Sequence, residues 1–160
     1  MKKIVSILVI VLFVFMHVTA MGAGTAAKTT AYNSVFDRQD STATRKVIIL
    51  SITDDTAGTT ATFSEDEVLG YWFCSMESIP NTTTPPTNDF DLTLSTAGGF
   101  DLLNGAGANL DSPTPNMVYS TIDSTTGQKG CVPVNSALTV DFSGNSVASG
   151  KIDVRFFFQR

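Results

Sequence analysis

The last ten residues, KIDVRFFFQR (residues 151–160), carry the pattern that decides the fold of this 160-residue chain. Apolar side chains stand at every second position, at Ile152, Val154, Phe156 and Phe158. Successive side chains of a β-strand point to opposite faces, so this alternation predicts a strand with one buried face. Burial of each of these side chains contributes roughly 1.5–3 kcal/mol, and we therefore expect this strand to close the fold.

Residues 45–150 repeat this behaviour in short runs that turn residues separate, without a helical period. The run at 67–79 is apolar on both faces in its first half, which predicts a central strand covered on each side. Seven or eight short strands predict an all-β fold, a single antiparallel β-sandwich or jelly-roll-like domain over residues 45–160. The other expected strands are residues 46–53, 58–64, 90–94, 118–122 and 138–142.

Residues 1–20, MKKIVSILVIVLFVFMHVTA, have the pattern of a secretory signal peptide. Lys2 and Lys3 precede an apolar run at residues 4–18, and Val18 and Ala20 are small residues at a cleavage position. The run is shorter than the about 20 apolar residues of a spanning helix, and an uncleaved membrane anchor is the alternative. We expect export to the cell-envelope exterior or the medium, with no membrane association after cleavage.

Residues 21–44 are rich in Ala, Thr, Gly and Ser and carry few apolar anchors. This composition predicts a flexible N-terminal arm that leads into the β domain. An arm of this kind is also suited to lending a strand to a neighbouring subunit, so both interpretations stay open.

Charge and the single histidine exclude several classes of function. Loss of residues 1–20 leaves eight basic and fifteen acidic residues, a net charge of −7, which argues against nucleic-acid binding. His17 lies within the signal peptide, so the mature chain has no imidazole for Ser-His-Asp or Cys-His catalysis. We therefore expect a protein that is not an enzyme. The remote alternative is a hydrolase that uses the paired carboxylates of Asp89 and Asp91, but the sequence indicates no cleft around them.

Cys74 and Cys131 both remain after cleavage. An even number of cysteines in an oxidising compartment predicts one disulfide, which closes a long loop. Two separate buried thiols, which behave as small apolar side chains, are the alternative.

The stretch FDLLNGAGAN (residues 100–109) raises the question of a phosphate or metal site. It lacks the third glycine of a dinucleotide-binding loop and the Lys-Ser/Thr pair of a P-loop. Asp and Asn also stabilise turns for local reasons, so we expect a tight turn with Leu102 and Leu103 packed inward and predict no cofactor. The oxygen-bearing side chains near this turn are the candidates for a calcium site: Asp89, Asp91, Asp101, Asn104, Asn109 and Asp111.

Aromatic side chains at residues 71–73 and 156–158 suggest a carbohydrate platform, although at strand spacing they are more typical of a core. Phe157 lies opposite the apolar face of the last strand, and it is the aromatic side chain we expect to be exposed.

Several motifs together resemble small proteins encoded among the virion genes of tailed bacteriophages. That family shows "G-Y-L-Y", then "P-G-x-x-A-P-T-x-x-Y-D-I-x-L", then "G-x-D-V-L-x-G-x-x-x-N-R", and ends on "G-x-L-T-L-x-V" and "G-x-V-x-L-Y" strands. The matching positions are Gly70 and Tyr71; Pro80, Pro86, Thr87 and residues 90–94; residues 99–103, Gly105 and Asn109; and residues 136–140 and 150–154.

The resemblance covers roughly residues 46–160. It implies a small β-sandwich with a structural role in a virion, in capsid decoration or in a tail, without catalysis, and here with an added signal peptide. The expected partners are other proteins or further copies of the chain, and the virion is the alternative location. A secreted bacterial surface module, either a carbohydrate binder or a filament subunit, is the second hypothesis.

Overall fold

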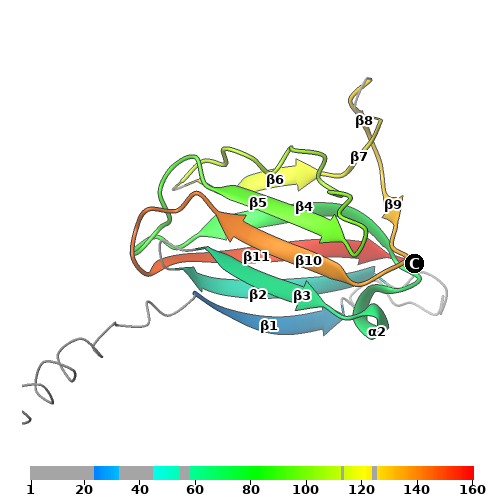
Figure 1. Ribbon diagram of the computed structural model, residues 1–160, viewed down its shortest axis with the longest axis horizontal. Helices are drawn as coiled ribbons and strands as arrows, with labels where there is room; N and C mark the ends of the chain where they lie inside the picture. The colour runs from blue at the N-terminus through cyan, green and yellow to red at the C-terminus, as the bar shows by residue number, and fades with distance from the viewer. Residues whose placement is uncertain (1–23, 33–44, 55–57, 113, 124–125) are drawn as a thin grey trace, which may run out of the picture.

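The computed structural model describes residues 24–32, 45–54, 58–112, 114–123 and 126–160, and these form antiparallel sheets (Figure 1). The signal peptide expected at residues 1–20 lies outside the described residues. The elements are β1 (Thr25–Tyr32), β2 (Arg45–Asp54), β3 (Thr59–Phe63), α2 (Glu65–Val68), β4 (Trp72–Pro80), β5 (Asp91–Thr96), β6 (Asn116–Tyr119), β7 (Thr121–Asp123), β8 (Gln128–Lys129), β9 (Val132–Pro133), β10 (Leu138–Ser143) and β11 (Gly150–Gln159).

The strands form one large and two smaller sheets. The main sheet has the order β1-β2-β11-β4-β6, with β9 also paired to β4. The small sheet has the order β3-β10-β5, and β7 and β8 form a separate hairpin. All of these pairings are antiparallel. The prediction of an all-β, antiparallel fold is confirmed.

Strand β11 lies inside the main sheet and pairs with β2 on one side and β4 on the other. Its four alternating apolar residues are each at most 2 % exposed, as the sequence predicts. Between them, Arg155 is exposed and Phe157 is half-buried on the opposite face. The C-terminal strand therefore fixes which face of the main sheet is the inner one.

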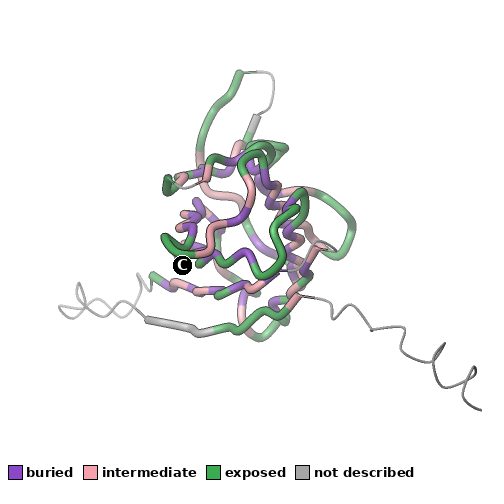
Figure 2. The backbone as a smooth tube through the Cα atoms, turned by 90° about the vertical axis from the view of Figure 1, so that its left-hand side faces the viewer, coloured by how far each residue is buried: buried purple, intermediate pink, exposed green. Residues whose placement is uncertain are grey.

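The inner face of the main sheet packs against the small sheet (Figures 1 and 2). The rings of Phe63 on β3 and Phe156 on β11 meet edge to face, with 5.1 Å between their centroids. Leu102 and Leu103 belong to the same buried cluster, which confirms that the glycine-rich turn packs its leucines inward. The apolar residues of β5 and β10 alternate as predicted, and the inner ones are buried.

Part of the predicted flexible arm is a strand. Residues 25–32 form β1, which pairs with β2 from Thr25↔Thr53 to Tyr32↔Lys46. Residues 25–28 are exposed and carry no large apolar side chains, so the sequence lacks the apolar alternation that would predict this strand. Backbone pairing covers the edge of β2, and Lys28 adds an ion pair to Glu67 at 2.6 Å. The flexible-arm prediction is wrong for residues 25–32, and residues 21–23 and 33–44 lie outside the described residues.

The start of the predicted strand at 67–79 also differs. Residues 65–68 form the short helix α2, where the Glu67 carboxylate accepts hydrogen bonds from the Ser64 N–H (2.8 Å) and hydroxyl (3.0 Å). Strand β4 begins at Trp72 and has a bulge opposite Phe157 and Phe158. The bulge brings both Phe73 and Met76 to the inner face, so β4 is central but covered on one face alone.

Candidate interaction face of the main sheet

The outer face of the main sheet, the side turned away from the small sheet, carries large exposed side chains. Tyr119 is 52 % exposed, Met117 is 48 % exposed and Trp72 is 47 % exposed. Met117 and Tyr119 flank Val118, which is buried in the core, so both point outward. Aromatic residues and Met are enriched in protein interfaces, and these three side chains mark this face as a candidate interaction surface.

Two rows of cross-strand neighbours organise this face. One row joins Val47, Phe157, Ser75 and Tyr119, from β2 across to β6. The next row joins Ile49, Arg155, Glu77 and Met117. Arg155 and Glu77 form an ion pair at 3.2 Å in the middle of that row. The face is thus a band of apolar side chains with charged groups inside it.

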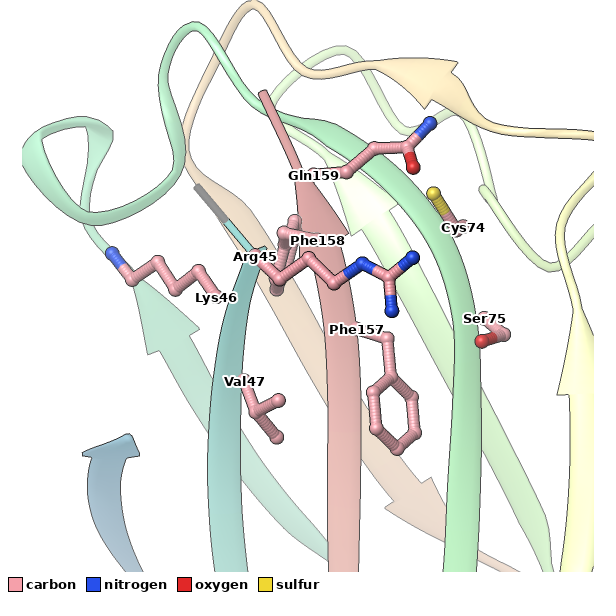
Figure 3. A pocket seen from close by; sticks show the side chains of 8 residues that line it. All are labelled: Arg45, Lys46, Val47, Cys74, Ser75, Phe157, Phe158 and Gln159. Carbon is pink, nitrogen blue, oxygen red and sulfur yellow. The ribbon is translucent and has the colours of Figure 1, made fainter. Parts of the chain in front are cut away.

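A hollow of about 280 Å³ lies over the first row where it crosses β2, β11 and β4 (Figure 3). Its lining includes Arg45, Val47, Ser75, Phe157 and Gln159. Figure 3 looks onto the outer face and shows the Arg45 guanidinium and the Ser75 hydroxyl on two sides of the Phe157 ring. Small Ser75 opposite the larger Phe157 ring leaves room for the hollow, and Gln159 lies at its far end.

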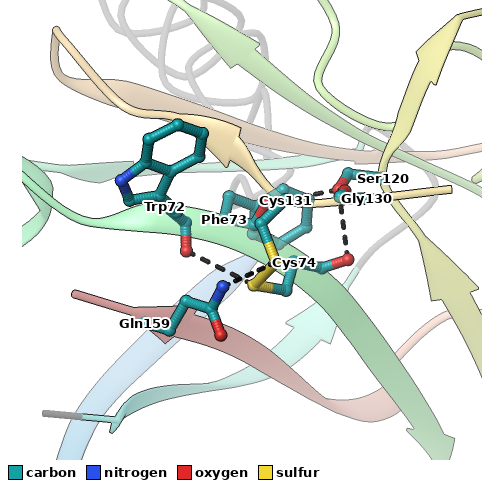
Figure 4. Close-up of a disulfide and its surroundings, with 7 residues drawn as sticks. All are labelled: Trp72, Phe73, Cys74, Ser120, Gly130, Cys131 and Gln159. Carbon is teal, nitrogen blue, oxygen red and sulfur yellow. Dashed lines mark hydrogen bonds between the residues drawn. A yellow bond between two sulfur atoms is a disulfide. The ribbon is translucent and has the colours of Figure 1, made fainter. Parts of the chain in front are cut away.

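Cys74 and Cys131 form a disulfide beside this hollow, as predicted (Figure 4). Cys74 is the bulged residue of β4, and Cys131 directly precedes β9. The Gln159 side-chain amide donates a hydrogen bond to the Cys131 sulfur at 3.1 Å. The disulfide therefore joins the strand that carries the hollow to the chain that follows the β7-β8 hairpin.

Ser120 supports the same junction from the buried side. Its hydroxyl lies within hydrogen-bonding distance of the carbonyl oxygens of Phe73 (3.2 Å), Cys74 (3.1 Å) and Gly130. Its backbone N–H donates to the Cys74 carbonyl at 3.1 Å, and the Gly130 N–H donates back to the Ser120 carbonyl at 3.2 Å. These bonds hold the base of the hairpin against β4. The sequence gives no sign of this role, because Ser120 stands inside the expected strand at residues 118–122 with nothing to mark it as a junction residue.

A charged cluster closes one end of the core next to α2. The Lys46 amino group donates to the Glu67 carbonyl and lies 5.2 Å from the Tyr71 ring centroid. Burial lowers the pKa of Lys46, Glu67 opposes this shift, and Lys28 adds to it. Burial alone raises the pKa of Glu67, but hydrogen bonds from Lys28 and Ser64 outweigh it and leave the pKa below its usual value.

The calcium candidates serve the turns near them. Asp101 accepts hydrogen bonds from the N–H groups of Leu103 (3.0 Å), Gly105 (2.8 Å) and Leu94 (3.3 Å). Asp91 accepts from the Asn109 N–H at 2.8 Å. Asp89, Asn104 and Asn109 have φ of 64°, 51° and 53°, the left-handed region that Asp and Asn tolerate. Asp111 is bonded through its backbone, to Asn116.

Within this glycine-rich turn, a Cβ at Gly107 would overlap the carbonyl oxygen of Leu92. The Leu92 N–H in turn donates to the Gly107 carbonyl at 2.8 Å. The turn is thus held to β5 by its own backbone. Among the described residues, no group of three or more His, Cys, Asp or Glu side chains is placed to hold a metal ion.

The aromatic residues divide between core and surface. Phe73, Phe156 and Phe158 are buried, whereas Trp72 is exposed and Phe157 is half-buried on the outer face. The sequence therefore places Phe157 on the correct face, but its side chain is half-buried and Trp72 is the exposed one of these aromatic residues. The sequence misses Met117 and Tyr119, because a strand of four residues is too short for their alternation with Val118 to mark them. It also misses Arg45, Ser75 and Gln159, which join the hollow only once β2, β4 and β11 are in register.

No protein-family model, no curated protein and no solved structure matches this chain. The resemblance to phage virion proteins therefore stays a prediction. Within the part of the chain that the structure describes, no helix is long and apolar enough to cross a membrane.

Proposed function

We propose that this protein is a non-enzymatic structural or interaction module, a β-sandwich of jelly-roll-like character related to phage virion proteins. It acts after export or in a virion, by associating with other proteins or with further copies of itself. The packing of the small sheet on the inner face of the main sheet supports the sandwich class.

One observation carries the proposal: the exposed Met117 and Tyr119 side chains next to each other on β6, in rows that continue across the outer face. The outer face supplies apolar contact area, and the ion pair of Arg155 and Glu77 supplies polarity within it. Interfaces between proteins combine apolar anchors with polar groups in this way. A net charge of −5 for the whole chain keeps the rest of the surface soluble.

Sedimentation velocity of the purified protein over a range of concentrations tests the proposal, with self-association as the expected result. A double variant, Met117→Lys with Tyr119→Lys, places two charges on the outer face and should shift the protein towards the monomer. Phe100→Lys is the control, because Phe100 is 58 % exposed but lies in the turn after β5, away from this face. A wild type that stays monomeric, or a loss of association that is equal in the control, would count against the outer face.

A further inference from the structure

The hollow beside Phe157 combines an apolar surface with polar groups of different kinds. We propose that it binds the carboxylate-bearing ring of an acidic sugar, such as a hexuronic acid unit of a polysaccharide. The site lies on the outer face but uses Arg45, Ser75, Phe157 and Gln159 rather than Met117 and Tyr119. This inference and the proposed function can therefore fail separately.

Arg45 supplies the group that recognises a carboxylate. Its side chain is exposed at the rim of the hollow, and it makes no hydrogen bond or ion pair with any of the described residues. Figure 3 shows the guanidinium reaching over the hollow above the Phe157 ring. The planar guanidinium matches a carboxylate with two parallel hydrogen bonds, which gives both charge and orientation.

Ser75 points to a ligand by a separate observation. The residue is only 9 % exposed, yet its hydroxyl has no hydrogen-bond partner among the described residues. Buried polar groups in proteins are almost always hydrogen-bonded, so a hydroxyl at this depth calls for a partner. Because Ser75 lines the hollow, a sugar hydroxyl or ring oxygen bound there supplies that partner.

The Phe157 ring and Val47 give the hollow its apolar side. The C–H face of a sugar ring is apolar and packs on an aromatic ring, while its hydroxyls point to the sides. Gln159 already donates from its amide nitrogen to Cys131, which leaves the amide oxygen to accept from a sugar hydroxyl. The disulfide thereby orients one of the ligand-binding groups.

The size of the hollow suits a single ring. Its volume of about 280 Å³ is just below the range of about 300–1,000 Å³ that is typical of small-molecule pockets. The hollow is partly open, so a ring bound there can remain one unit of a longer polysaccharide chain. A free carboxylate without a ring would use Arg45 and leave Phe157 and Ser75 without contacts.

NMR titration of the purified protein tests the inference with four probes, of which the first three are methyl glucuronide, methyl glucoside and acetate. Methyl glucuronide should shift the signals of Phe157, Ser75 and the Gln159 side-chain amide. Methyl glucoside and acetate should each bind at least about tenfold more weakly, because the glucoside lacks the carboxylate and acetate lacks the sugar ring. A peptide with a free C-terminal carboxylate is the fourth probe, and it should also bind more weakly.

Arg45→Gln should weaken glucuronide binding about tenfold or more, whereas Arg155→Gln, with the same loss of charge on the same face, should leave it unchanged. Ser75→Ala should weaken it independently of charge. Thermal unfolding of each variant checks that the fold persists. Equal loss in Arg155→Gln, equal binding of glucoside or acetate, tighter binding of the peptide, or no binding of the glucuronide would each overturn the inference.

Discussion

Among single residues, Asp101 is the one on which the glycine-rich turn depends. Its carboxylate accepts hydrogen bonds from three backbone N–H groups, on both sides of the turn. Asp101→Ala should therefore lower the free energy of unfolding by about 2 kcal/mol, since hydrogen bonds to a charged acceptor are the stronger kind. Urea denaturation measures the change.

Asp111→Ala is the matched control, because the structure shows only backbone contacts for Asp111. It should change the free energy of unfolding by less than about 0.5 kcal/mol. Millimolar calcium should leave the urea midpoint of the wild type unchanged. A calcium-dependent rise that disappears in Asp101→Ala would instead make this turn a metal site.

Glu67 gives a prediction about pH. The folded protein holds the pKa of Glu67 below its usual value, so ionised Glu67 stabilises the fold at neutral pH. That contribution is present above the unfolded pKa, near 4.5, and is lost as the pH falls through the lower, folded pKa. Glu67→Gln should therefore destabilise the protein at pH 7 and cost progressively less below about pH 4.5.

Urea denaturation at several pH values measures this difference between wild type and variant. Glu65→Gln is the control, because Glu65 lies in the same helix and its side chain forms no ion pair with Lys28 or any other described residue. If the Glu67→Gln difference is independent of pH, or if Glu65→Gln behaves in the same way, the Lys28–Glu67 pair does not support the end of the core.

Among the elements, β11 allows the two faces of the main sheet to be compared directly, because Phe156 lies on the inner face and Phe157 on the outer face. Phe156 is fully buried and its ring meets those of Phe63 and Phe73, at centroid distances of 5.1 Å and 6.5 Å. Phe156→Ala should lower the free energy of unfolding by about 3–5 kcal/mol through loss of contacts and a new cavity. Phe157→Ala, one position along on the outer face, should cost about 1 kcal/mol. Equal costs in thermal or urea unfolding would contradict the assignment of inner and outer faces.

The disulfide is the second test among the elements. Cys74 and Cys131 are separated by 57 positions, and closing a loop of this length stabilises a protein by about 4 kcal/mol in the chain-entropy relation. The double variant Cys74→Ala with Cys131→Ala should be less stable by up to this amount in urea denaturation. The denatured wild type should show no titratable thiol before reduction. Two titratable thiols would show that Cys74 and Cys131 are not bridged.

The strands show what the sequence can and cannot predict. β5, β10 and β11 are predicted because apolar residues at every second position are a local signal of a half-buried strand. β1 is missed because it pairs through its backbone and its first residues are exposed. The bulge in β4 is missed because it exists only relative to β11, which is about 80 residues away in the chain.

The candidate site follows the same logic. Phe157 is predicted as exposed from its place in β11 alone, and the disulfide is predicted from the cysteine count. The hollow is not predicted, because Arg45, Ser75 and Gln159 come from three strands and meet through strand register. The short β6 gives too few residues for alternation to identify Met117 and Tyr119 in advance.

For the whole molecule, one face of the main sheet is used for the core and the other remains open. The outer face holds the exposed apolar residues and the hollow, while the inner face packs on the small sheet. A structural protein that acts outside the cytoplasm needs such a surface for its partners and a covalent link that persists in an oxidising compartment. Both features are consistent with the proposed function.

The most direct measurement is to separate a producing culture by density gradient and determine the intact mass of the protein in each fraction. The proposed function predicts recovery outside the cytoplasm, together with particles, envelope or filaments. Full-length protein in DNA-filled particles would favour the virion role, and protein shortened near Ala20 in the envelope or medium would favour export. Recovery as a free, full-length monomer in the cytoplasm would contradict the proposal.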